Sequence, residues 1–194
     1  MAIVLEITDL SYKDFSNINL SFKDKTYYSI IGSNNSGKTT LFKLISGIIP
    51  SNNSISCMDT LLNRKEVNLY ITKLGIVSRV NKNSFIYKHV FDEMMYPLTN
   101  LGYSYNKSLN RINELLELFN KTDILNKSIS ELDIYDQQLL LIMISLLHRP
   151  KVLLLDSVLE LFSQDKYIEI LKVFKKLVND GLCIITFTNN SDIA

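Results

Sequence analysis

One stretch of the chain combines two glycines, a lysine and a hydroxyl side chain at a spacing that could do chemistry. It consists of Gly32-Ser33-Asn34-Asn35-Ser36-Gly37-Lys38-Thr39 and fits the pattern G-x-x-x-x-G-K-[ST]. In this pattern the glycines let backbone N–H groups curl around a β-phosphate, the lysine reaches the β- and γ-oxygens, and the hydroxyl ligates Mg²⁺. The stretch, extended by Thr40, therefore predicts a site for a nucleoside triphosphate and Mg²⁺.

The flanking residues are expected to place this loop between a strand and a helix. Residues 27–31 favour a buried strand that ends at Gly32, and Gly47 and Pro50 would stop the helix that follows. The helix is indicated by apolar residues at helical spacing, namely Leu41, Leu44, Ile45 and Ile48. The loop would then open onto a helix N-terminus, where free N–H groups favour anions. The alternative is an ordinary glycine turn.

A second acidic position supports the same chemistry. The apolar run 152–155 is expected to be a buried strand, and it ends at Asp156. An aspartate at the end of such a strand binds the Mg²⁺ held by the loop hydroxyl, here Thr39. The alternative is an ordinary acidic residue at a strand end.

Composition limits the class of protein. The 194 residues, 46% of them hydrophobic, suffice for one α/β domain, and a net charge of +1 gives no field that would attract nucleic acid. The longest apolar run, 139–147, is too short to span a bilayer, and no export signal is apparent. The cysteines, Cys57 and Cys183, are far apart and favour free thiols in a reducing cytosol.

Several further segments carry a periodic apolar pattern. Residues 3–7 alternate as an edge strand would, and residues 18–22 alternate again, which indicates an N-terminal β layer. Helices are expected over 106–120 and 136–148, another helix has Tyr167, Leu171, Phe174 and Val178 on one face, and the last strand covers 182–187. Buried strands that alternate with helices predict an α/β fold with a parallel sheet.

The chain resembles the ATP-binding cassette (ABC) ATPases over essentially its whole length. The anchors are the phosphate loop, residues 148–156 and residues 184–188. It is most similar to the energy-coupling-factor (cobalt and vitamin importer) ATPases, through Val90-Phe91-Asp92-Glu93 and the segment 96–102. The resemblance implies a P-loop NTPase of ABC type: one domain, 1–194, with a mostly parallel sheet, an N-terminal antiparallel β layer and a helical subdomain at about 82–148. It also implies ATP and Mg²⁺ as cofactors.

Most catalytic positions of that family are changed here. The Q-loop glutamine, whose amide oxygen ligates Mg²⁺, corresponds to Arg79, and a guanidinium has no acceptor. The general-base glutamate corresponds to Ser157, whose hydroxyl is far too weak a base. Asn189 replaces the switch histidine and Ser163 replaces the D-loop aspartate. The resemblance thus retains Thr39 and Asp156 as metal ligands but leaves no confident catalytic residue.

The adenine-stacking aromatic and the signature are also altered. Tyr12 is the candidate for stacking on adenine, with Phe15 as the alternative, and an aromatic with no such role is the competing interpretation. The family signature L-S-G-G-Q falls on Leu132-Asp133-Ile134-Tyr135-Asp136, where only Leu132 survives. In the family this signature closes over the ATP of a head-to-tail partner. Asp133 would turn a carboxylate toward that triphosphate, and Tyr135 would fill space that is normally empty.

Three functions follow as hypotheses. The first is an ATP-binding subunit of an importer, at the cytoplasmic face of the membrane, which pairs with a second ABC ATPase subunit and docks on a transmembrane coupling subunit through the region after Arg79. The second is a pseudo-ATPase that binds ATP without hydrolysing it. The third is a GTPase or nucleotide kinase, although residues 188–192 match the guanine-selecting N-K-x-D poorly. We expect a transporter-type subunit that binds Mg·ATP with weak or absent hydrolysis.

Overall fold

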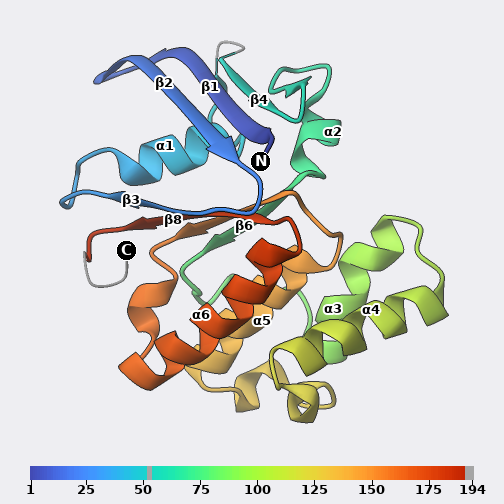
Figure 1. The fold of residues 1–194 in the computed structure, drawn as a ribbon. Coiled ribbons are helices and arrows are strands. Elements are labelled where there is room, and N and C mark those ends of the chain that lie inside the picture. Colours follow the sequence, from blue (N-terminus) through green and yellow to red (C-terminus); the bar gives the residue numbers. More distant parts are fainter. Residues whose placement is uncertain (52–53, 191–194) are drawn as a thin grey trace.

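The protein folds around two four-stranded sheets, one antiparallel and one parallel (Figure 1). The computed structural model describes residues 1–51 and 54–190. Helix α1 (Lys38–Ile45) lies between the two sheets, and helices α5 (Ile134–Leu146) and α6 (Gln164–Asn179) cover the other face of the parallel sheet. The predicted α/β architecture, with an N-terminal β layer and a parallel sheet, is therefore confirmed.

The parallel sheet has the strand order β3-β8-β7-β6. Its strands are β3 (Tyr27–Ile31), β6 (Leu74–Ser78), β7 (Val152–Asp156) and β8 (Cys183–Thr188). Every residue of β7 and β8 is buried, as expected for central strands covered on both faces. β3 was predicted to be buried, but its residues are half-buried or exposed because this strand is an edge of the sheet.

The antiparallel sheet has the order β2-β1-β4-β5. It consists of β1 (Ile3–Tyr12), β2 (Phe15–Lys23), β4 (Ile55–Cys57) and β5 (Thr60–Leu61). The prediction of an edge strand at residues 3–7 is wrong, because β1 is longer and lies between β2 and β4. The short strand β4 pairs with residues 5–7 of β1 and so covers the edge of β1 that does not pair with β2.

The remaining helices complete two hydrophobic cores. They are α2 (Val67–Ile71), α3 (Val90–Asn100), α4 (Tyr105–Leu118), α5 (Ile134–Leu146) and α6 (Gln164–Asn179), with 3₁₀ turns η1 (Thr122–Ile124), η2 (Ile129–Glu131) and η3 (Leu159–Leu161). Met94 of α3 and Ile112 of α4 pack in one cluster with Leu155 and Phe174. The helices therefore share a core with the parallel sheet. The division of the chain into a helical subdomain at about 82–148 and the remainder stays a prediction.

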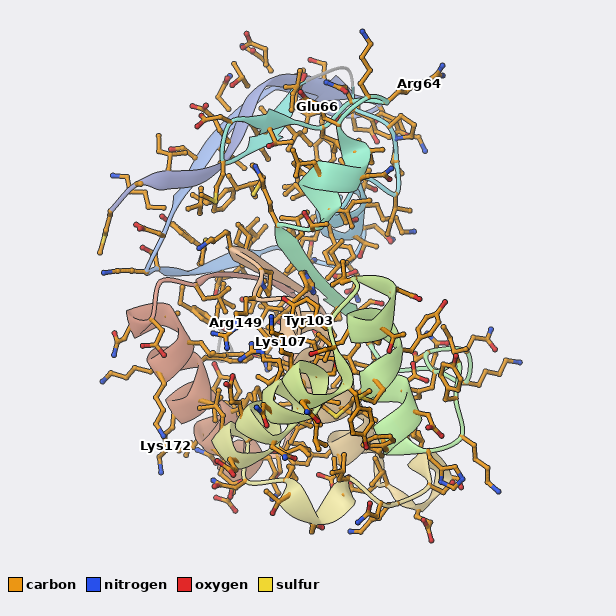
Figure 2. The ribbon with its side chains drawn as sticks, turned by 90° about the vertical axis from the view of Figure 1, so that its right-hand side faces the viewer. Arg64, Glu66, Tyr103, Lys107, Arg149 and Lys172 are labelled. Atoms are coloured by element: carbon orange, nitrogen blue, oxygen red, sulfur yellow. The ribbon has the colours of Figure 1, made fainter. Side chains whose placement is uncertain are left out.

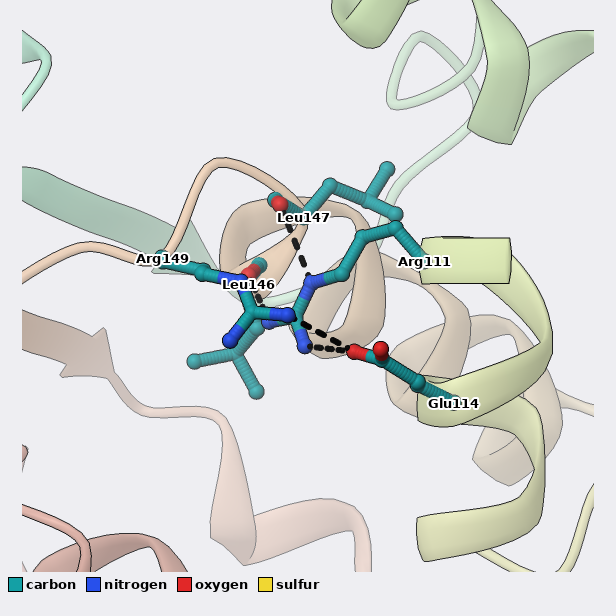
Figure 3. Close-up of polar contacts among 5 residues, drawn as sticks. All are labelled: Arg111, Glu114, Leu146, Leu147 and Arg149. Carbon is teal, nitrogen blue, oxygen red and sulfur yellow. Dashed lines mark hydrogen bonds and ion pairs between the residues drawn. The ribbon is translucent and has the colours of Figure 1, made fainter. Parts of the chain in front are cut away.

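An arginine of α4 joins that helix to the end of α5 (Figure 3). The Arg111 guanidinium donates hydrogen bonds to the carbonyl oxygens of Leu147 at 3.1 Å and Leu146 at 2.7 Å. Glu114 accepts from both Arg111 and Arg149 at 2.9 Å. Burial lowers the pKa of Arg111 from its usual value. Carbonyls at a helix C-terminus lack intrahelical partners, so this side chain satisfies two of them.

Figure 2, turned by 90° from Figure 1, shows Tyr103 and Lys107 on or beside α4 and Arg149 after α5. Lys107 is exposed. Among the described residues it forms no ion pair, unlike Arg149, which is held by Glu114 at 2.9 Å.

Candidate functional site

The carboxyl edge of the parallel sheet brings the predicted site residues together. The strand register pairs Ile31 with Thr188 and Asp156 with Phe187, and Ser78 lies opposite Asp156. The residues that follow these strand ends are therefore neighbours in space although they are distant in sequence: the phosphate loop, Arg79, Ser157 and Asn189. This convergence is the position at which parallel α/β sheets bind ligands.

The phosphate loop is held to the sheet and folded back by its own lysine. The N–H of Gly32 donates to the carbonyl of Thr188 at 3.3 Å. The Lys38 ammonium donates to the carbonyl oxygens of Gly32 at 2.7 Å and Ser33 at 2.8 Å. Since these carbonyls belong to the same loop, the lysine holds the loop in a closed curve.

Two glycines of the loop lie where an added Cβ would displace a neighbouring side chain. A Cβ on Gly32 would lie 2.5 Å from Oγ of Ser36, and a Cβ on Gly37 would lie 2.6 Å from the ring of Phe15. Gly37 also has a φ of +91°, which side-chain-bearing residues rarely adopt. Asn35 has a φ of +64°, a conformation that asparagine tolerates better than most residues. The curve of the loop therefore depends on these residue types.

The loop borders a cavity of about 670 Å³. It is lined by Asp14, Asn34, Asn35, Ser36, Gly37, Lys38, Thr39, Thr40, Ser157 and Asn189. Nine of these ten were predicted as nucleotide-binding or catalytic-position residues, and only Asp14 was not predicted. The volume is within the usual range for small-molecule sites.

The predicted metal ligands meet beside this cavity. The Thr39 hydroxyl lies beside the carboxylate of Asp156, and Oδ1 of Asp156 is buried without a hydrogen-bond partner among the described residues. Burial raises the pKa of Asp156; the Thr39 hydrogen bond lowers it, the charge of Glu160 raises it and that of Lys38 lowers it. A buried carboxylate oxygen that lacks a partner, next to a hydroxyl, fits a hard cation such as Mg²⁺.

The two aromatic candidates lie at the end of the β1–β2 hairpin. Tyr12 and Phe15 are paired across the hairpin, and the Lys13 ammonium lies 5.5 Å from the centre of the Tyr12 ring. Phe15 packs against Gly37 of the loop, whereas neither ring lines the cavity. The assignment of Tyr12 to adenine stacking stays a prediction, and Phe15 is the ring in contact with the loop.

Glu160 is a site residue that the sequence reasoning missed. Its Oε1 accepts a hydrogen bond from the Thr188 hydroxyl at 3.2 Å and from the N–H of Asn189 at 3.4 Å. The Asn189 amide donates to Oδ1 of Asn34 at 3.1 Å. The only signal for Glu160 in the sequence is that an acidic residue follows shortly after Asp156.

The Ser157 backbone, which has a φ of +54°, is held in place because its N–H donates a hydrogen bond to the carbonyl of Phe187.

Arg79 follows β6, and a buried glutamine holds its backbone. Gln138 of α5 accepts from the N–H of Val80 at 2.8 Å and donates to the carbonyl of Ser78 at 3.3 Å. The Arg79 side chain is exposed and forms no hydrogen bond or ion pair within residues 1–51 and 54–190. Gln138 was also missed, although a glutamine directly before the apolar run 139–147 was a visible signal in the sequence.

The N-terminus of α5, where the signature was predicted, is capped by its own carboxylate. Asp133 accepts from the N–H of Asp136 at 2.7 Å. Tyr135, which was expected to fill space that is normally empty, packs within this chain: its side chain is 9% exposed and its ring centre lies 4.7 Å from that of Phe162. Its ring also lies 5.4 Å from the ammonium of Lys121, which forms an ion pair with Asp136.

The remaining sequence hypothesis, residues 188–192 as a guanine-selecting segment, extends into Ser191 and Asp192, which lie outside the described residues. No helix in the described part of the chain has the length and apolar character that a membrane crossing requires.

Comparisons with known proteins agree with the geometry. The sequence model of a family described as ABC transporter matches residues 15–160. The "Energy-coupling factor transporter ATP-binding protein EcfA1" of Streptococcus pyogenes, in serotypes M5 and M1, is 27% identical over 202 residues, which cover 99% of this chain and 72% of that protein.

Solved structures show the same fold. The cbiO1 protein of Clostridium perfringens, described as part of the ABC transporter complex cbiONQ, superposes with a TM-score of 0.89 at 23% identity, over 99% of this chain and 80% of that one. MJ1267, an ATP-binding cassette of an ABC transporter in its ADP conformation, gives 0.83 at 17% identity, over 100% and 84% of the two chains.

Proposed function

The chain belongs to the ABC transporter family, and we propose that it binds Mg·ATP as the ATP-binding subunit of an energy-coupling-factor-like transporter, with weak or absent hydrolysis. The observation that carries the proposal is the meeting of Thr39 and Asp156 beside the phosphate loop, with an Asp156 oxygen left free of hydrogen bonds. Bound Mg²⁺ would neutralise charge on the phosphates. Lys38 and the backbone N–H groups of the loop would bind the phosphate oxygens.

Weak hydrolysis is proposed because the cavity carries no suitable base at the positions where the family has its catalytic groups. Ser157 and Asn189 line it where the family has a glutamate and a histidine, and neither accepts a proton well at neutral pH. The exposed Arg79 replaces a metal-binding amide. The capped α5 N-terminus favours the second candidate, a pseudo-ATPase in which ATP stabilises an assembly, because Asp133 occupies one backbone donor, the Asp136 N–H, and places a carboxylate where a partner's γ-phosphate would lie.

The proposed partners are a second ABC ATPase subunit, arranged head to tail, and a transmembrane coupling subunit, with no nucleic acid. Docking on the membrane partner is supported by exposed apolar residues after Arg79: Ile86 is 72% exposed, and the rings of Tyr87 and Tyr96 lie 5.4 Å apart. Glu93 accepts from the N–H groups of Ile86 and Tyr87 at 2.9 and 2.6 Å and so holds this segment on α3. Such an assembly places the chain at the cytoplasmic face of the membrane.

The test of nucleotide binding is a thermal-shift titration with ATP and Mg²⁺. A ligand at 100 times its Kd adds about 2.7 kcal/mol to the free energy of unfolding. For a domain of this size that corresponds to a rise in Tm of roughly 5–10 °C. The rise should disappear in Lys38→Ala, measured against its own ligand-free Tm, and persist in the control Lys172→Ala on the exposed face of α6. Wild-type protein with no shift at millimolar ATP would refute the proposed function.

A further inference from the structure

A chain of hydrogen bonds runs from Glu160 to the phosphate loop. The Glu160 carboxylate accepts from the Thr188 hydroxyl at 3.2 Å and from the N–H of Asn189 at 3.4 Å. The Asn189 amide donates to the side-chain oxygen of Asn34 at 3.1 Å. The carbonyl of Thr188 in turn accepts from the N–H of Gly32 at 3.3 Å. The end of β8 is therefore hydrogen-bonded to an acidic side chain on one side and to Gly32 and Asn34 of the phosphate loop on the other.

The Glu160 side chain is not needed to hold its own segment in place. Its neighbours Val158 and Leu159 are 1% and 3% exposed and anchor η3 in the core. The Glu160 carboxylate is half-buried, and all of its hydrogen bonds within the described residues go to the end of β8. Removing it should leave the fold intact and release residues 188 and 189.

We propose that Glu160 is a positioning residue, which fixes Asn189 against Asn34 and so preforms the phosphate cavity before nucleotide arrives. This inference rests on the proposed binding of Mg·ATP. A loop that is already ordered loses less conformational freedom on binding, so the bound nucleotide is held more tightly and dissociates more slowly. The position that carries the family's switch histidine thus serves, in this chain, as a fixed link between the end of β8 and the loop.

The decisive measurement is the Kd and dissociation rate of ATP that carries an N-methylanthraniloyl fluorophore, with Mg²⁺. Glu160→Ala should raise the Kd about fivefold, the size expected for one or two lost hydrogen bonds, mainly through faster dissociation. Glu160→Gln keeps an oxygen that accepts both hydrogen bonds and should stay near the wild-type value. The matched control is Glu117→Ala, an exposed glutamate of α4.

A double-mutant cycle separates positioning from a general loss of stability. Asn189→Ala should raise the Kd by a similar factor. The Kd of the double variant Glu160→Ala/Asn189→Ala should be no higher than that of the single variant with the higher Kd, because both changes break the same chain of hydrogen bonds. Additive effects, or a Kd unchanged in Glu160→Ala, would overturn the inference and leave the proposed function standing. Wild-type protein without measurable binding would overturn both. A Kd change confined to temperatures near the Tm of the variant would reduce Glu160 to a folding role.

Discussion

At the scale of single residues, the chain retains the residues proposed to bind Mg·ATP and differs from the family at its catalytic positions. Lys38, Thr39 and Asp156 are present and converge on one edge of the sheet. The cavity beside them presents hydroxyl and amide side chains from Ser157 and Asn189. A site with this composition can bind a triphosphate through charge and hydrogen bonds, whereas neither Ser157 nor Asn189 is a base that would activate water.

Hydrolysis by the isolated chain should therefore lie at or near background. Phosphate release would be compared between wild type and Lys38→Ala, and the two rates should agree. Ser157→Glu alone should restore little, because Arg79 and Asn189 would still replace the family's metal-binding amide and switch histidine. Wild-type turnover within the common range of about 1–10³ s⁻¹, abolished by Lys38→Ala, would show that another residue supplies the base.

At the scale of secondary-structure elements, the sequence predicted what is periodic or contiguous. The helices α4, α5 and α6 and the strands β7 and β8 follow from apolar spacing, and the phosphate loop follows from an unbroken motif. α3 carries Pro97 in its interior, and proline usually disfavours a helix interior, so periodicity alone did not indicate it. The strands β4 and β5 have three and two residues, too few to show alternation.

The missed site residues share a different cause. Glu160 accepts a hydrogen bond from Thr188, which lies 28 residues away in the sequence, and Gln138 accepts one from Val80, 58 residues away. Neither contact belongs to a local pattern, and each depends on strand order in the parallel sheet. The edge position of β3 and the inner position of β1 were missed for the same reason, because pairing partners are set by the whole topology.

The junction between α4 and α5 yields a stability prediction. Arg111→Ala removes two hydrogen bonds from a charged group and leaves the carbonyls of Leu146 and Leu147 without that donor. We expect a loss of about 2–4 kcal/mol in the free energy of unfolding, measured by urea denaturation. Lys107→Ala, an exposed change on the same helix, should stay within about 0.5 kcal/mol. Equal effects from the two variants would show that the carbonyls find water instead.

At the scale of the whole molecule, two different changes fall on one chain. In the proposed head-to-tail assembly, Ser157 and Arg79 would alter the site on this chain's own phosphate loop, whereas Asp133 would alter the surface that closes over a partner's ATP. A carboxylate near a triphosphate costs about 1 kcal/mol per charge pair at 4 Å in water and about 4 kcal/mol in a partly buried cleft. A competent partner would therefore not restore an ordinary pair of ATP sites.

Assembly provides the last prediction, and the structure guides its design. Tyr135→Gly would empty a buried site against Phe162 at a cost of about 3–5 kcal/mol, so that residue should be kept. Asp133→Ser/Ile134→Gly removes the carboxylate, and serine caps a helix as well as aspartate does. With Ser157 unchanged the nucleotide would persist, so this variant should form dimers with Mg·ATP in sedimentation velocity.

The comparison variants decide how such dimers are interpreted. Adding Lys38→Ala to Asp133→Ser/Ile134→Gly removes the proposed phosphate contact and should return the protein to the monomer, which ties the dimer to bound nucleotide. Ser157→Glu alone should stay monomeric with Mg·ATP, because each site would still face the carboxylate of Asp133. This carboxylate caps α5 by accepting a hydrogen bond from the N–H of Asp136 at 2.7 Å. If the unmodified chain already dimerises on ATP, Asp133 does not obstruct closure and the N-terminus of α5 is not the surface that meets the partner's nucleotide.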